Sequence, residues 1–146
     1  MYARNEIRTT LTAEQLWPAL VTAPRWPQWY PYAQRVQIAG GGEALTASST
    51  FTWTTLRVRV KTQVTEFDTA RRLAWSGSRP GAAGYHRWLL TPTAVGGCLV
   101  VTEEVQTGLL PRLAAGRLRR SLSANHQRWL EGLVEVSRAP DQPTTA

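Results

Sequence analysis

The segment from Thr46 to Glu66 carries the strongest strand signal in the chain. Within it, apolar and β-branched side chains alternate with polar ones, as they do on the two faces of a strand. The first face comprises Leu56, Val58, Val60, Thr62 and Val64, and the second comprises Arg57, Arg59, Lys61 and Gln63. Phe51 and Trp53 alternate in the same way just before these residues. The pattern predicts a sheet with one buried and one solvated face, which is typical of antiparallel strands.

Shorter runs predict the rest of the sheet. The further predicted strands are 6–10, 35–39, 73–77, 85–91 and 98–105. Gly40-Gly41-Gly42 follows the second of these, and 68–71 has the composition of a turn. We expect loops at 78–83 and 92–97, because both segments contain proline and glycine.

Two short helical pieces are predicted before most of the strands. Thr12 and Gln15 have the spacing of a capping box, in which each side chain satisfies a free amide at the helix start. Pro18 lacks an amide proton, so it kinks this first helix or limits it to a few turns. The next segment, 23–32, is rich in proline and tryptophan and predicts one short helical turn between bends.

From Pro111 onward the apolar period becomes that of a helix. Its apolar stripe is Leu118, Leu122, Asn125 or His126, Trp129, Leu133 and Val136. A helix of about seven turns follows from this repeat, and it is the longest predicted element. We expect the tail, 139–146, to be disordered because it is rich in proline and threonine.

Length and composition limit the class of protein. At 146 residues the chain has the size of one domain, which we place at 1–138. Its start lacks the apolar run of a signal peptide, and no stretch reaches the ~18 apolar residues of a membrane helix, so we expect a cytoplasmic protein. The single Cys98 excludes an internal disulfide, and with only His86 and His126 beside it we expect no metal site and no other cofactor.

The buried face of the predicted sheet needs a cover, and only the C-terminal helix is long enough to supply one. The predicted fold is therefore α+β: a curved antiparallel sheet wrapped around a long C-terminal helix, with an internal cavity between them. Seven tryptophans supply wide apolar plates for such a cavity. The candidate ligand-binding residues are Trp29, Tyr32, Trp53, Val58, Val60, Trp75, Trp88, Leu122, Asn125, His126 and Trp129.

Several stretches resemble a known family. They are Leu16-Trp17 with Trp26-Pro27-Gln28-Trp29-Tyr30-Pro31-Tyr32, Glu66-Phe67-Asp68 with Arg71-Arg72-Leu73-Ala74-Trp75, and Gly96-Gly97-Cys98 through Glu104 with Gly108-Leu109-Leu110. In this order, over residues 3–137, the chain resembles the SRPBCC proteins of the START-like, helix-grip type, especially the bacterial polyketide cyclase/dehydrase branch. Cys98 stands where that family usually has threonine, so no role of the threonine hydroxyl carries over.

The resemblance implies a helix-grip fold that binds a small hydrophobic or aromatic ligand in an internal cavity. It leaves the activity open, because this fold hosts both enzymes and carriers. One alternative is a polyketide cyclase, dehydrase or aromatase that holds a reactive chain in a folded shape and moves protons. The other is a carrier of lipids or other hydrophobic ligands, without catalysis.

His86 is the first candidate for proton transfer. It alternates with Trp88 and Leu90, which places it on the inward face, where a histidine can act as an acid or a base or serve as a bonded core residue. If the hairpin turns near Ala94, His86 lies opposite Thr102 and about 13 Å along the sheet from Cys98. That separation excludes a Cys–His dyad, and we expect Cys98 to be a small buried hydrophobe.

Polar residues on two other elements are candidate helpers. One of Glu103 and Glu104 must point inward, and we take Glu104 as a second catalytic candidate. The alternative is that this carboxylate pairs with an arginine. Either Asn125 or His126 should face the sheet, where it needs a ligand, a water molecule or a backbone group as a partner.

The chain has 17 lysine and arginine residues against 10 acidic ones. The basic residues concentrate on the outer sheet face, with Arg57, Arg59, Lys61 and Arg87, and on the early helix, with Arg112, Arg117, Arg119 and Arg120. We interpret both as solvated faces. Nucleic acid is not an expected partner, because the aromatic residues alternate away from the arginines. The remaining alternative is a basic surface for an acidic partner, which the family resemblance narrows to an acidic carrier protein.

Overall fold

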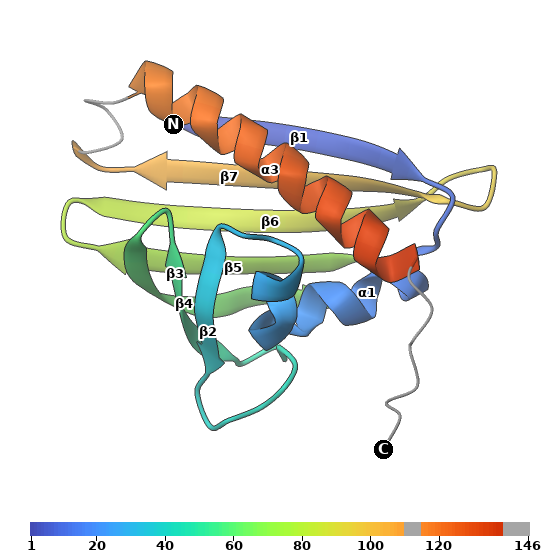
Figure 1. Ribbon diagram of the computed structural model, residues 1–146, viewed down its shortest axis with the longest axis horizontal. Coiled ribbons are helices and arrows are strands. Elements are labelled where there is room, and N and C mark those ends of the chain that lie inside the picture. The colour runs from blue at the N-terminus through green and yellow to red at the C-terminus, as the bar shows by residue number, and fades with distance from the viewer. Residues whose placement is uncertain (110–114, 139–146) are drawn as a thin grey trace.

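The computed structural model describes residues 1–109 and 115–138. The strands are β1 (Tyr2–Thr9), β2 (Ala33–Ile38), β3 (Thr50–Thr55), β4 (Val58–Asp68), β5 (Arg72–Arg79), β6 (Ala82–Pro92) and β7 (Cys98–Thr107). The helices are α1 (Ala13–Val21), the 3-10 helix η1 (Ala23–Gln28) and α3 (Ala115–Arg138). All seven strands form one antiparallel sheet in the order β1-β7-β6-β5-β4-β3-β2, and α3 crosses one of its faces (Figure 1). This arrangement confirms the predicted α+β helix-grip fold.

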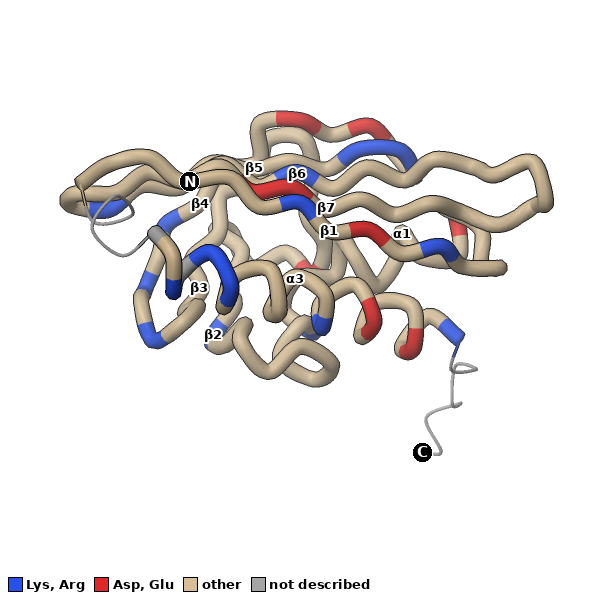
Figure 2. The backbone as a smooth tube through the Cα atoms, turned by 90° about the horizontal axis from the view of Figure 1, so that it is seen from above, with Lys and Arg blue, Asp and Glu red and all other residues tan. Residues whose placement is uncertain are grey.

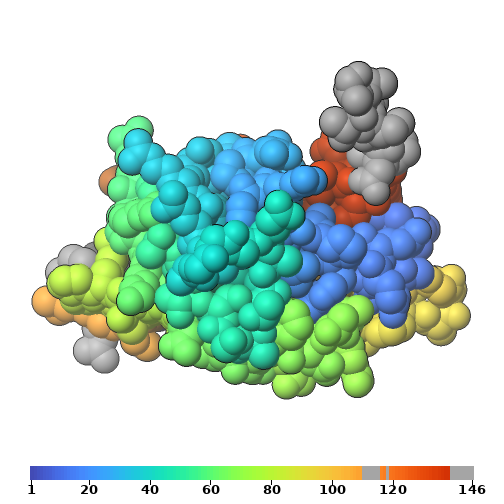
Figure 3. Space-filling view, turned by 90° about the horizontal axis from the view of Figure 1, so that it is seen from below, coloured from blue at the N-terminus to red at the C-terminus, as the bar shows by residue number. Residues whose placement is uncertain are grey.

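The short helices form as their sequences predict. The Thr12 side-chain oxygen accepts a hydrogen bond from the backbone N–H of Gln15 at 3.2 Å. The Gln15 side-chain oxygen accepts one from the backbone N–H of Thr12 at 2.9 Å, which completes the capping box. Pro18 lies inside α1, which ends after Val21. The helix η1 then closes one end of the sheet, and Figure 3 shows the side chains of α1 and β2 packed into a continuous surface on this side.

Helix α3 packs its apolar side against the sheet and α1. The buried apolar residues of this helix are Leu122, Trp129, Leu130, Leu133 and Val134. Gly132 allows a close approach to the chain after η1, because a β-carbon there would lie 2.7 Å from the Trp29 carbonyl oxygen. The predicted helix start at Pro111, the Leu118 side chain and the tail 139–146 lie outside what the structure describes.

Two predicted boundaries in the sheet are wrong. The alternation of 46–66 runs through a hairpin turn at Leu56 and Arg57, whose φ angles are 49° and 66°. Two consecutive positive φ angles define a type I′ turn, which normally uses asparagine and glycine. Leucine and arginine are not typical of this turn, so the sequence carries no turn signal here. Leu56 is consequently 39% exposed instead of lying on the buried face. The expected loop 78–83 is a tight hairpin, since β5 runs to Arg79 and β6 starts at Ala82.

The β6–β7 register also differs from the expected one, by two residues. Pro92 pairs with Cys98, so the turn is centred on Val95 and each β6 residue moves to a later partner. His86 therefore lies opposite Glu104, not Thr102. Cys98 remains far from His86 along the sheet and is a fully buried free thiol, as expected.

An aromatic cluster forms the core between the sheet and the helices. Trp26 of η1 lies at its centre, with its ring centroid 5.2 Å from Trp129, 5.4 Å from Trp75 and 5.8 Å from Trp53. The Trp26 indole N–H donates to the Leu20 carbonyl at 3.0 Å. Trp53, Trp75 and Trp129 of this cluster also line a cavity.

Candidate functional site

A cavity of about 120 Å³ lies between α3 and the inner face of the sheet. Its deep walls are aromatic: Tyr30 stacks on Trp129 at 4.4 Å, and Trp53 and Trp75 complete the surface. Toward the surface it reaches Leu56 in the β3–β4 turn and residues of the β5–β6 hairpin. Because a dry cavity of about 150 Å³ holds benzene, this space suits a ligand group of about one ring.

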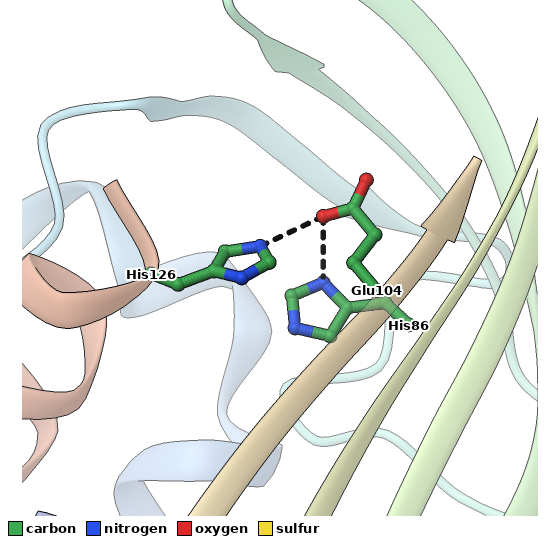
Figure 4. A group of neighbouring side chains, drawn as sticks. All are labelled: His86, Glu104 and His126. Atoms are coloured by element: carbon green, nitrogen blue, oxygen red, sulfur yellow. Dashed lines mark hydrogen bonds and ion pairs between the residues drawn. The ribbon is translucent and has the colours of Figure 1, made fainter. Parts of the chain in front are cut away.

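Three ionisable side chains meet on one wall of this cavity. His86 comes from β6, Glu104 from the neighbouring strand β7, and His126 from α3 (Figure 4). Glu104 Oε2 lies 2.8 Å from His126 Nε2 and 3.6 Å from His86 Nδ1. The β6–β7 pairing brings the first two together, and the packing of α3 on the sheet adds the third.

Glu104 is an ionised carboxylate held by donors. Burial raises its pKa, but the hydrogen bond from His126 and the neighbouring imidazoles outweigh burial, so the pKa lies below its usual value. The Gln106 side chain donates a further hydrogen bond to Oε1 at 2.5 Å. Since an ionised carboxylate only accepts, the proton in the short contact with His126 belongs to Nε2 of the histidine.

His86 is a neutral imidazole in this setting. Burial is the main cause that lowers its pKa to about 3, the neighbouring His126 adds to the effect, and Glu104 opposes it. Nε2 lies 2.6 Å from the Thr102 hydroxyl oxygen. The carboxylate near Nδ1 favours the ring proton on that atom, which leaves Nε2 to accept from the Thr102 hydroxyl.

Two buried nitrogen atoms at the cavity have no hydrogen-bond partner among the described residues. They are Nδ1 of His126 and the indole Nε1 of Trp129. Both side chains belong to α3 and line the cavity. Unpaired buried polar atoms are uncommon in native proteins, and they mark positions where a bound molecule can supply the partner.

Most of the predicted ligand-binding residues line this cavity, together with both catalytic candidates. Those in the lining are Trp53, Val60, Trp75, His86, Glu104, Leu122, Asn125, His126 and Trp129. Asn125 and His126 are both buried, although only one of them was expected to face inward. Of the two adjacent glutamates it is Glu104 that points to the cavity, and its partners are histidines and not an arginine, which was the alternative.

Four predicted ligand-binding residues lie outside the lining. Trp88 is fully buried behind His86, on which it stacks with centroids 5.7 Å apart. Trp29 packs against Gly132, and the Tyr32 hydroxyl accepts from Arg128 at 2.6 Å. Val58 begins β4 directly after the β3–β4 turn. Alternation identified the inward face correctly for Trp88 but could not tell a wall from the layer behind it.

The most informative lining residue that the sequence did not reveal is Tyr30. It is 3% exposed, and burial together with the Glu104 charge raises the pKa of its hydroxyl. It follows η1 in a segment without regular periodicity, so no pattern assigned it to the cavity. Thr62 also lines the site, where its hydroxyl accepts from the Trp53 indole at 3.1 Å.

The fold and this cavity define a helix-grip protein of the ligand-binding class. A family model described as "Polyketide cyclase / dehydrase and lipid transport" matches residues 3–138. The chain therefore belongs to this family, which confirms the resemblance predicted from its sequence.

Solved structures share the fold across the chain. A hypothetical protein of Helicobacter pylori is 26% identical, with a TM-score of 0.87 over 94% of this chain and 88% of that one. A protein of Thermus thermophilus is 14% identical, with a TM-score of 0.78 over 97% of this chain and 100% of that one. The di-domain ARO/CYC StfQ of the steffimycin biosynthetic pathway is 18% identical, with a TM-score of 0.74 over 93% of this chain and 50% of that one. A comparison with curated proteins gives no match.

Among the helices of the described part of the chain, none is both long enough and apolar enough to cross a bilayer.

Proposed function

We propose that the cavity binds a small aromatic or polyketide-like ligand and that Glu104, with His126, accepts a hydrogen bond from a hydroxyl group of that ligand. The observation that carries this proposal is the Glu104–His126 pair, 2.8 Å apart, set in the wall of an otherwise aromatic cavity. Burial of an ionised group is costly unless it is paired. A cavity that held only hydrocarbon would gain nothing from a carboxylate in this place.

The dimensions and lining favour a flat ligand. Tyr30, Trp53, Trp75 and Trp129 offer aromatic faces and edges for one ring in the cavity. The volume of about 120 Å³ is below the several hundred Å³ usual for drug-sized ligands. A longer chain would therefore place one ring or one folded segment inside and extend past Leu56 toward solvent.

The same groups can carry out cyclase-type chemistry. Glu104 would take a proton from a carbon flanked by two carbonyl groups, and the enolate would attack another carbonyl of the same chain. The Tyr30 hydroxyl would protonate the new alkoxide and regain its proton from Glu104, and loss of water would follow in an aromatisation. Proton transfer of this kind contributes about 10²–10⁴-fold to a rate. In this scheme His86 lies beside Glu104 and helps to position it, and His86 is not the primary acid or base.

Carriage of a hydrophobic ligand without turnover is the second candidate. The largely apolar lining and the lipid-transport part of the family description support it. Native mass spectrometry of the protein from its host separates the candidates. A bound unsaturated or polyketone chain that is converted on incubation supports the cyclase, and a bound saturated lipid that stays unchanged supports the carrier.

A pair of matched probes tests the role of the carboxylate. 1-Naphthol and naphthalene have the same fused rings and differ in one hydroxyl, so one ring of each can occupy the cavity while the other extends toward its mouth. Each can be titrated by quenching of tryptophan fluorescence. We expect 1-naphthol to bind at least tenfold more tightly, because a hydrogen bond to a charged group contributes about 1.5–3 kcal/mol. Glu104→Gln should reduce that preference, whereas Glu103→Gln on the outer face should retain it. Equal affinities for both probes in the parent protein would contradict the proposal.

The open end of the cavity favours an anionic partner. Arg79 lines the cavity mouth, Arg57 follows Leu56 in the nearby turn, and Arg117, Arg119 and Arg120 are exposed on the first turns of α3. Figure 2 shows basic residues gathered at this end, with most acidic residues further along the molecule. Such a rim suits delivery of the ligand by an acidic carrier protein. Reversal of Arg119 and Arg120 to glutamate should weaken that docking at least tenfold.

A further inference from the structure

The His86, Glu104 and His126 side chains bring three atoms of metal-ligand type to one point. Each side chain offers one ligand atom, and these atoms lie within 4.8 Å of one another. Oε2 of Glu104 contacts Nδ1 of His86 and Nε2 of His126. Each comes from a different element of the fold, so the packing of α3 on the paired strands assembles the group (Figure 4). A count of cysteine and histidine alone predicts no metal site, and the carboxylate between the two histidines changes that expectation.

The distances fit coordination of a small divalent ion. Bonds of about 2.0–2.2 Å to nitrogen and oxygen in a tetrahedral arrangement separate neighbouring ligand atoms by roughly 3.3 Å. Oε2 of Glu104 lies 2.8 Å from Nε2 of His126 and 3.6 Å from Nδ1 of His86, which brackets this separation. The ligand atoms of the two imidazoles lie within 4.8 Å of each other, so the side chains would rotate to bring all three atoms to this separation as an ion replaces the His126 Nε2 proton.

Two of the three candidate ligands, His86 and Glu104, have further hydrogen-bond partners. A ligating histidine normally donates its second ring nitrogen to a fixed partner, and ligating carboxylates are hydrogen-bonded in turn. The Thr102 hydroxyl lies 2.6 Å from Nε2 of His86 and can accept its proton once Nδ1 binds an ion. Gln106 donates to Oε1 of Glu104 and leaves Oε2 to face the two imidazoles. These contacts supply the second layer of hydrogen bonds that metal ligands normally have.

We propose that His86, Glu104 and His126 form a binding site for a divalent first-row transition-metal ion, with its remaining coordination positions open to the cavity. Two imidazoles and one carboxylate suit Zn²⁺, Fe²⁺, Co²⁺ or Ni²⁺ and disfavour Mg²⁺ and Ca²⁺, which prefer oxygen ligands. Three protein ligands with an open position are typical of sites that also bind a water molecule or a ligand oxygen. The inference is independent of the proposed function, because the side chains can bind an ion with or without an organic ligand.

Metal titration of the tag-free protein tests the site. The protein is stripped with EDTA and titrated with Zn²⁺ by calorimetry and with Co²⁺ by visible absorption near neutral pH. We expect one ion per chain with a dissociation constant in the micromolar range or below, and Co²⁺ absorption bands of a four- or five-coordinate site. Mg²⁺ should give no binding at millimolar concentration. Absence of stoichiometric Zn²⁺ binding would overturn the proposal.

Matched variants locate the bound ion. Glu104→Gln and His126→Gln should weaken Zn²⁺ binding at least tenfold, while Glu103→Gln, on the other face of the same strand, should leave it within twofold. Thr102→Val keeps all three ligands and should weaken binding by roughly 10–100-fold through loss of the partner of His86. Circular dichroism of each variant checks that it is folded. Equal Zn²⁺ affinity in the parent and in folded Glu104→Gln would place the ion elsewhere and refute the site.

The titration with 1-naphthol and naphthalene is carried out in EDTA, so the two proposals can fail separately. Selective 1-naphthol binding without Zn²⁺ binding refutes the metal site alone. Stoichiometric Zn²⁺ binding without any preference for 1-naphthol refutes the proposed carboxylate role alone.

Discussion

The two faces of β7 place consecutive glutamates in different chemical settings. The side chains of Glu103 and Glu104 are each 15% exposed. Glu103, on the outer face, pairs with Arg87 at 2.5 Å and accepts from the Tyr2 hydroxyl at 2.8 Å. Glu104, on the inner face, meets two histidines and a glutamine beside the aromatic cavity. Glu103 and Glu104 are therefore equally exposed, but Glu103 pairs with an arginine and Glu104 with histidines.

The two glutamates differ in their partners and not in the direction of their pKa shifts. In both side chains burial raises the pKa and the partners lower it below the usual value, so the pKa direction alone does not distinguish them. The partners do: an arginine is permanently charged and ties up its carboxylate, whereas an imidazole can gain or lose a proton or bind an ion. The inner carboxylate therefore has partners that can exchange a proton or bind an ion, and the arginine partner of the outer carboxylate cannot.

The largest expected contrast between the faces is in folding stability. Trp88 and Arg87 are neighbours on β6, and Trp88 is fully buried while the Arg87 side chain is 34% exposed. Trp88→Ala should lower the free energy of unfolding by about 3–5 kcal/mol because it leaves a cavity behind His86. Arg87→Ala should cost about 1 kcal/mol or less. Urea denaturation measures both, and similar losses would show that the core does not extend behind His86.

Acid should lower the free energy of unfolding of the protein through His86 on the inner face of the sheet. The pKa of His86 is about 3 in the folded protein and about 6.5 in the unfolded chain, so the unfolded state binds more protons between these values. Stability is therefore lost as pH falls below about 6.5, and His86 alone should account for about 2 kcal/mol between pH 7 and pH 5. Glu104, whose folded pKa is also lowered, adds to the loss at lower pH.

The acid effect can be assigned by substitution. His86→Gln cannot titrate, so its unfolding free energy should fall about 2 kcal/mol less than that of the parent between pH 7 and pH 5. Denaturant titrations in EDTA at both pH values provide the comparison. An unchanged pH slope in this variant would mean that folding does not lower the pKa of His86.

The inner face was largely predictable from the sequence because alternation is a local property. His86, Trp75 and Trp53 fall on the cavity side as their spacing indicates, and the capping box fixes the start of α1. The sequence could not predict the register between strands β6 and β7. A turn centred one residue later moved the partner of His86 to Glu104, and no periodicity within either strand reports that displacement.

Other misses have specific physical causes. Leu56 and Arg57 adopt positive φ angles that their residue types disfavour, so a propensity argument continues the strand through the turn. Such strained positions often border functional sites, and Leu56 does lie on the cavity mouth. Tyr30 reaches the cavity through the fold of an irregular segment. The contact between His126 and Glu104 depends on how α3 crosses the sheet, which is a tertiary property.

A smaller effect is expected from the outer carboxylate. Glu103→Gln removes the ion pair with Arg87, and pairs near the surface contribute about 1 kcal/mol or less. The loss should shrink further in roughly 0.5 M NaCl, because salt screens exposed charges. Chemical denaturation at two salt concentrations measures it. A salt-independent loss above about 2 kcal/mol would show that Glu103 is as critical to the fold as the inner face.

The smallest expected effect is on ligand binding when the rim charge is reversed. Arg119 and Arg120 are exposed on α3 and do not belong to the cavity lining. A neutral ligand gains little from them, since charges in solvent are screened over about 8 Å at physiological salt. Arg119→Glu with Arg120→Glu should therefore leave the 1-naphthol dissociation constant within twofold in a fluorescence titration. A change above fivefold would mean that these arginines reach the bound ligand, and the proposed separation between the cavity and the basic residues near its mouth would have to be abandoned.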